Sequence, residues 1–183
     1  MPELHDSRSY TIRQVRREDY EDGKYDEVHA WLREIEEFLA IRFEPEDLES
    51  NRIFWMRNVD TQDEKSHIIL GAFLDDELIG QTDLGYPGET GRSPGRHVGA
   101  WGLAVKKEFH NQGVGQALLE AIEALARDLG LHKLAAEVVD NNEPAKALYL
   151  RKMGYEVEGR KKEHFLHDSG EFMDMLVIGK ILD

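Results

Sequence analysis

The feature that most constrains this chain is a strand that runs through a short loop into a glycine-opened, strongly amphipathic helix. Residues 96–105 are expected to form the strand, and Gly113 and Gly115 open the helix. The apolar residues of the helix recur at helical spacing, at Val114, Leu118, Leu119, Ile122, Leu125, Ala126 and Leu129. Gly130 supplies the helix stop. Such a stripe has to be buried, and the strand before it predicts packing on a sheet.

The remaining apolar pattern predicts a mixed α/β sheet with helices packed against it. We expect further strands at residues 10–15, 67–74, 77–84, 131–139, 154–166 and 171–181. We expect further helices at residues 25–40, from near Pro45 to Arg57, and at residues 142–153. This order excludes the strict alternation of a doubly wound fold. No repeat, low-complexity segment or long linker divides the chain, so residues 1–183 are expected to form a single domain.

Composition excludes several classes of protein. The 183 residues contain no cysteine, which excludes a disulfide framework, a CxxC site and a thiol nucleophile of the chain's own. A formal net charge of −14 opposes binding to nucleic acid or anionic lipid. No apolar stretch is long enough to cross a bilayer, and the start of the chain lacks the apolar core of a signal peptide. We therefore expect a soluble cytoplasmic protein that binds neither nucleic acid nor membrane.

The acidic residues are concentrated towards the N-terminus. Residues 1–50 hold 15 acidic residues against 7 basic ones. One interpretation is a set of solvated helix surfaces that aid solubility. The other is a funnel for a cationic partner.

The two glycines that open the central helix indicate a candidate phosphate site. Glycine lets backbone amides approach a ligand closely, and free amides at a helix N-terminus attract anions. The loop is not a Walker loop, because no Gly-Lys-Ser/Thr follows, so ATP binding would lack its lysine and its Mg²⁺-binding hydroxyl. Ala117 and Leu118 stand where a dinucleotide-binding GxGxxG loop needs its third glycine. A merely tight turn is the alternative.

A second constellation begins where the strand at 131–139 ends. Asn142 taken alone is explained as a helix N-cap whose side chain accepts a backbone amide. Tyr149 taken alone is explained as a residue that packs the helix on the sheet. Their combination with the glycine loop is more specific than either residue.

Together these segments resemble the GNAT superfamily of N-acetyltransferases from about His67 to the C-terminus. The residues that carry the resemblance are Leu103-Ala104-Val105, the loop from His110 to Gly115, Asn142-x-x-Ala145, Leu148-Tyr149, and Gly154-Tyr155 with Glu158-Gly159. The tail, with Gly170, Glu171-Phe172 and Asp174, is similar to the branch that acetylates polyamines and ribosomal-protein N-termini. One departure is His110, which stands where the family pattern has Arg or Gln.

The resemblance implies a mainly antiparallel sheet of about seven strands, splayed between the fourth and fifth, with about four flanking helices. It also implies acetyl-CoA as co-substrate, with the pantetheine arm in the splay and the pyrophosphate on the glycine loop. The implied cofactor-binding residues are Leu103, Ala104, Val105, His110, Asn111, Gln112, Gly113, Val114, Gly115, Gln116 and Asn142. Tyr149 would act as general acid to the departing thiolate.

The implied activity is transfer of an acetyl group to a primary amine, by direct attack in a ternary complex. The charge balance favours a cationic acceptor, either a polyamine-like small molecule or a protein N-terminus. The alternative from another class is a catalytically inactive CoA-binding regulatory module. An exposed edge after the last strand could support a homodimer.

The sequence does not select the base that would deprotonate the acceptor amine. His97, Glu137 and Asp83 are candidates, and none has a spacing that favours it. No metal is expected, because His164 and His167 in a strand would point to opposite faces.

Overall fold

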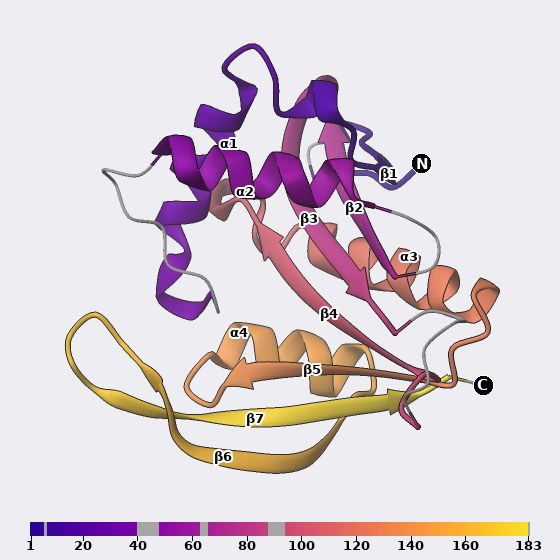
Figure 1. Cartoon of the computed structure of the whole chain (residues 1–183), viewed down its shortest axis with the longest axis vertical. Helices are drawn as coiled ribbons and strands as arrows, with labels where there is room; N and C mark the ends of the chain where they lie inside the picture. The colour runs from indigo at the N-terminus through magenta and orange to yellow at the C-terminus, as the bar shows by residue number, and fades with distance from the viewer. Residues whose placement is uncertain (6, 40–47, 63–65, 88–93, 183) are drawn as a thin grey trace.

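The computed structural model describes residues 1–5, 7–39, 48–62, 66–87 and 94–182. Within these residues, one mixed sheet lies between two groups of helices (Figure 1). Its strands are β1 (Thr11–Gln14), β2 (His67–Leu74), β3 (Glu77–Gly85), β4 (Val98–Val105), β5 (Lys133–Val139), β6 (Glu156–Leu166) and β7 (Phe172–Ile181). The α-helices are α1 (Lys24–Glu34), α2 (Leu48–Asp60), α3 (Val114–Asp128) and α4 (Glu143–Lys146). Shorter turns are η1 (Arg17–Asp19), η2 (Glu36–Phe38), η4 (Lys107–Phe109) and the π-helical η5 (Ala147–Lys152).

The strand order across the sheet is β1-β2-β3-β4-β5-β7-β6. Neighbouring strands are antiparallel except β4 and β5, which run parallel. The parallel pairing covers three residue pairs and ends at Ala100 with Ala135. Beyond that pair the strands separate, and we call this region the β4–β5 splay. The splayed, mainly antiparallel sheet expected from the sequence is confirmed.

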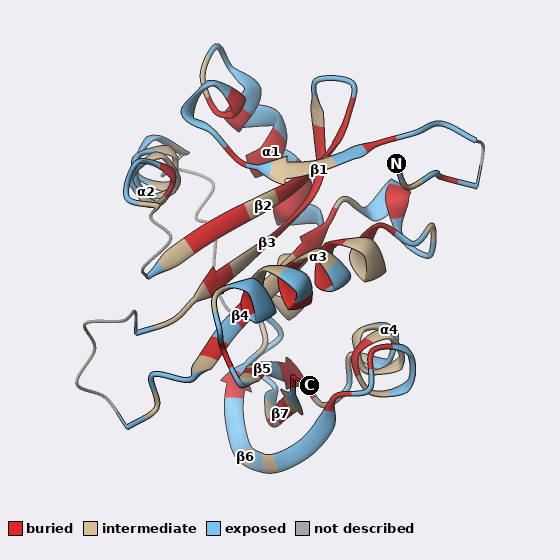
Figure 2. Ribbon diagram, turned by 90° about the vertical axis from the view of Figure 1, so that its right-hand side faces the viewer, coloured by how far each residue is buried: buried red, intermediate tan, exposed pale blue. Residues whose placement is uncertain are grey.

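The two faces of the sheet are covered by different helices (Figure 2). Helices α1 and α2 bury their apolar residues with Ile69, Phe73 and Ala104 on one face. The stripe of α3 and the aromatic residues that follow α4 pack on the opposite face, around Leu134 and Trp101. We call these the α1/α2 face and the α3/α4 face.

Several predicted boundaries change in the structure. The helix expected at 25–40 ends at Glu34, after which η2 forms one short turn. The helix expected at 142–153 is α4 followed by the π-helical η5. The helix start expected near Pro45 lies outside the described residues, and α2 is described from Leu48. The last strand is not an edge, because β7 inserts between β5 and β6.

Candidate active site

Backbone groups of β4 face the β4–β5 splay. The amide of Lys106 donates to the Ile79 carbonyl at 2.9 Å, and Val105 pairs with Gly80. In an antiparallel ladder this pattern makes Val105 and Leu103 members of non-hydrogen-bonded pairs with β3. Their N–H and C=O groups therefore point away from β3 and towards the side on which β5 has separated. An extended ligand chain could pair with them as an added strand would.

The N-terminus of α3 lies at the end of the loop that follows β4. Gly113 is its N-cap residue, with φ of 86°, and no side chain in the described part of the chain caps the helix. A Cβ at Gly113 would meet nothing within 4 Å, so the turn is open to solvent. The first-turn amides, from Val114 to Gln116, have no acceptor within the helix. Uncapped amides at the positive end of a 15-residue helix suit an anionic phosphate group.

The imidazole of His110 binds the end of β4. Its Nε2 lies 2.8 Å from the carbonyl oxygen of Val105. A carbonyl only accepts, so this contact assigns the proton to Nε2 of His110. The ring therefore ties the glycine loop to the strand and satisfies one carbonyl that would otherwise face the splay. The N–H and C=O groups of Leu103 and the amide of Val105 also lie on this strand edge.

Gly115 brings α3 against both neighbouring elements of the site. A Cβ at this position would lie 3.2 Å from Leu148 Cδ2 and 3.4 Å from Leu103 Cδ2. The absence of a side chain at Gly115 therefore allows α3 to approach β4 and η5 closely.

Asn142 caps α4, as predicted by its interpretation as a helix N-cap. Its Oδ1 accepts the Ala145 amide at 3.1 Å. The loop around it is held by charges, because Lys146 contacts the Asp140 carboxylate and Arg160 Nη1 lies 2.6 Å from Asp140 Oδ2. The end of β5 and the start of α4 are thus fixed beside the splay.

Tyr149 is buried on the π-helical turn η5. Its ring packs edge-on against Trp101 of β4, with centroids 4.9 Å apart. Burial raises the pKa of Tyr149 well above its ordinary value, so the phenol stays protonated at neutral pH. Trp101 was not among the site residues expected from the sequence. The sequence feature that could have identified it is its position as an aromatic residue on the strand before the glycine loop.

The three candidate bases lie at different places. His97 precedes β4, at the end where β4 and β5 are still paired. Asp83 on β3 pairs with Gly102 of β4, just past the point where the strands separate. Glu137 lies on β5 at a corresponding level and forms an ion pair with Lys161. The structure brings Asp83 and Glu137 to the splay and leaves His97 at its closed end.

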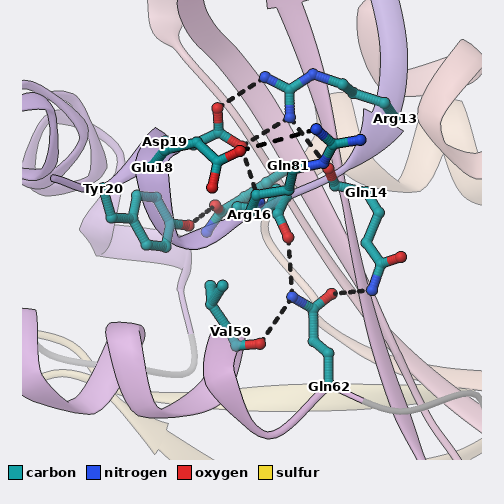
Figure 3. Close-up of polar contacts among 10 residues, drawn as sticks. Arg13, Gln14, Arg16, Glu18, Asp19, Tyr20, Val59, Gln62 and Gln81 are labelled. Atoms are coloured by element: carbon teal, nitrogen blue, oxygen red, sulfur yellow. Dashed lines mark hydrogen bonds and ion pairs between the residues drawn. The ribbon is translucent and has the colours of Figure 1, made fainter.

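A polar network fixes the N-terminal segment on the α1/α2 face (Figure 3). Asp19 accepts two hydrogen bonds of 2.7 Å from Arg13 and one of 2.8 Å from the Arg16 amide. Burial opposes ionisation of Asp19, but these bonds lower its pKa below its usual range. The buried Tyr20 hydroxyl donates to Gln81 Oε1 of β3 at 2.6 Å. The turn η1 is therefore anchored to both β1 and β3.

Two hollows lie between this segment and α2. The smaller has a volume of about 270 Å³ and is lined by Tyr20, Gly23, Tyr25, Asp26, Leu48, Glu49 and Arg52. The larger has a volume of about 550 Å³ and is lined by Arg17, Glu21, Asp22, Arg52, Ile53, Met56, Arg57 and Asp60. Both carry charges of each sign, so arginines partly offset the acidic residues of this region.

Two classes of feature are not found in the described part of the chain. No three or more His, Cys, Asp or Glu side chains there gather in a way that could hold a metal ion. No helix among the described residues combines the length and apolar character needed to cross a membrane.

Comparison with known proteins identifies the family to which this chain is similar. The family model described as Acetyltransferase (GNAT) family matches residues 14–155. A ribosomal-protein-alanine N-acetyltransferase from Brucella melitensis aligns at 26% identity and TM-score 0.73, over 94% of this chain and 99% of that one. A GCN5-related N-acetyltransferase from Kribbella flavida aligns at 25% identity and TM-score 0.74, over 94% and 98%. An N-acetyltransferase from Staphylococcus aureus Mu50 shares the fold at 17% identity and TM-score 0.76, over 96% and 99%. No curated protein matched the chain by sequence.

Proposed function

Because this chain belongs to the GNAT family of acetyltransferases, we propose that it transfers the acetyl group of acetyl-CoA to a cationic primary amine. The observation that carries the proposal is the pairing of β4 with β5, which stops at Ala100 and leaves the strand edge of Leu103 beside the uncapped start of α3. A ligand with an extended amide-bearing arm and a pyrophosphate matches both features at once.

The residues present fit acetyl-CoA as the acetyl donor. The backbone of Leu103 and the amide of Val105 would pair with the pantetheine arm. The amides of the turn from Asn111 to Gln116 would hold the pyrophosphate, and His110 keeps that turn on β4. Asn142 would add its side-chain amide, because its cap uses the oxygen and leaves the nitrogen to donate.

The acceptor ammonium first loses a proton to solvent, and the neutral amine then attacks the thioester carbonyl carbon directly. The new C–N bond forms, the C–S bond breaks, and the electron pair passes to sulfur. Tyr149 donates its phenolic proton to that sulfur, and the amide nitrogen releases its extra proton to solvent. Burial keeps Tyr149 protonated and therefore able to donate.

The acceptor is proposed to be a polyamine-like molecule or a protein N-terminus. Exposed carboxylates on the N-terminal segment, including Asp22, Asp26 and Glu27, favour cations near the α1/α2 face. The Brucella melitensis neighbour acts, by its name, on a ribosomal-protein alanine, which supports a peptide amine as one of the two acceptor types.

A thiol-release screen tests the proposal. Acetyl-CoA is offered with polyamines, amino acids, aminoglycosides and basic peptides, and amine-dependent release of CoA thiol is the expected result. If CoA raises the Tm but no amine releases thiol, the chain is a CoA-binding regulatory module instead.

A further inference from the structure

A carboxylate lies directly over β4 where the strands part. Asp83 pairs with Gly102, which is two residues beyond the last residue of β4 that pairs with β5. A Cβ at Gly102 would lie 2.9 Å from Asp83 Oδ1. The carboxylate therefore occupies the space that a side chain at Gly102 would fill, and it does so with 48% of its side chain exposed.

Strand alternation places Asp83 on the α1/α2 face. Gln81, two residues earlier on β3, accepts the Tyr20 hydroxyl from the N-terminal segment on that face. Leu84, the next residue after Asp83, is buried with Trp101 and Tyr149 on the α3/α4 face. Asp83 and Tyr149 thus lie on opposite faces, one on each side of the splay. An acceptor that approaches from the α1/α2 face meets Asp83 before it reaches the splay.

Asp83 also differs from Glu137, the other acidic residue near the splay, because a neighbouring lysine neutralises only Glu137. Glu137 alternates with the buried residues Ala136 and Val138, so it faces the same side as Asp83, and Lys161 neutralises it. Within the described ranges, Asp83 accepts no hydrogen bond. His67 Nε2 lies 3.9 Å from Asp83 Oδ2, beyond hydrogen-bond distance, and forms an ion pair with it only when the imidazole is protonated. Of these two carboxylates, Asp83 is therefore the one left to bind an incoming cation.

We propose that Asp83 binds the acceptor ammonium group at the mouth of the β4–β5 splay and selects cationic amines over neutral ones. The inference rests on the proposed acetyl transfer and adds to it the residue that recognises the acceptor. A charge-assisted hydrogen bond to a half-exposed carboxylate acts on capture of the amine. Its loss should therefore raise the acceptor KM and leave kcat little changed.

The test removes the negative charge of Asp83 and keeps the shape of its side chain. In Asp83→Asn, kcat/KM for spermidine should fall by about 10-fold to 100-fold. The value for an alkoxyamine, which is uncharged at neutral pH, should stay within about twofold. The matched control is Asp75→Asn, at the turn between β2 and β3 at the other end of the same hairpin. It removes the same charge away from the splay and should leave both acceptors unaffected.

Binding measurements separate the inference from the proposed function. Calorimetric titration of spermidine into the protein with CoA should show binding for the wild type and for Asp75→Asn, and loss of it for Asp83→Asn. That pattern supports the inference even if no amine is acetylated, in which case only the proposed function fails. Equal losses for spermidine and the alkoxyamine, a selective loss in Asp75→Asn, or unchanged spermidine binding in Asp83→Asn would overturn it.

Discussion

The ring of Tyr149 stands edge-on to the indole of Trp101, with centroids 4.9 Å apart and planes at 83°. Trp101 belongs to β4, and Tyr149 belongs to a π-helical turn, a backbone form often found at functional sites. The contact fixes the phenol beside the strand whose edge faces the splay. The phenol is held protonated because burial of Tyr149 raises its pKa. A protonated phenol can donate a proton, which is the role proposed for Tyr149.

Tyr149→Phe tests that role. Phenylalanine keeps the edge contact with Trp101 and removes only the proton donor. Turnover should fall by about 100-fold, and acetyl-CoA affinity should change little. Steady-state kinetics at saturating amine and calorimetry with acetyl-CoA measure the two effects.

The matched control is Tyr155→Phe. Tyr155 is also buried and packs on Trp101, with centroids 5.3 Å apart. It lies beyond η5, so turnover of Tyr155→Phe should stay near the wild-type value. Turnover of Tyr149→Phe within about twofold of wild type would leave Tyr149 with a packing role alone.

His110 should determine how firmly the glycine loop is held on β4. In His110→Ala the loop loses its hydrogen bond to the Val105 carbonyl, so the amides are less well positioned for phosphate. The Kd for CoA should rise by about tenfold, with kcat at saturation nearly unchanged. Calorimetry measures the Kd, and His164→Ala, which removes an exposed ring from β6, is the control. An unchanged Kd in His110→Ala would show that the loop holds its shape without the ring.

Gly113 and Gly115 should respond differently to valine. Gly113 has a positive φ and open space around it. Gly113→Val therefore strains the turn, and its main effect should be weaker CoA binding, with only a small decrease in Tm. Gly115 contacts Leu148 and Leu103 closely, so Gly115→Val should also cost about 1–3 kcal/mol of unfolding free energy by overpacking. Thermal unfolding without ligand and calorimetry with CoA separate the effects. Equal loss of Tm in both variants would contradict the difference.

The ion pair of Asp19 with Arg13 should make stability depend on pH. The hydrogen bonds lower the folded-state pKa of Asp19. Its contribution is therefore present above the unfolded pKa of about 3.9 and is lost as pH falls through the folded value. At pH 7, Asp19→Asn should lose about 1–3 kcal/mol, and the difference from wild type should shrink towards pH 2. Urea unfolding measures both, and Glu18→Gln, in an exposed pair with Arg16, should change little at either pH.

The sequence predicted local elements better than contacts between them. The bounds of β2 and the stripe of α3 follow from periodicity, and both are as expected. The early end of α1 at Glu34 was missed, because Ile35 and Phe38 continue the helical spacing although the backbone turns into η2. The bond from His110 to Val105 and the position of Asp83 over Gly102 depend on strand register and side-chain direction. The order of residues along the chain reveals neither strand register nor side-chain direction.

The final prediction concerns the acidic N-terminal segment. Asp22, Asp26, Glu27 and Glu34 are exposed, whereas Glu21 is paired with Arg17. The exposed carboxylates should speed capture of cations over distances comparable to the Debye length, about 8 Å at 0.15 M salt. For spermidine, kcat/KM should therefore fall as salt rises from about 0.05 to 0.5 M, whereas an uncharged alkoxyamine should show a nearly flat profile. Replacing Asp26 and Glu27 together by Asn and Gln should reduce the spermidine slope without altering that of the alkoxyamine. Equal salt slopes for the two acceptors would leave these carboxylates as solvated surface residues that do not influence the choice of substrate.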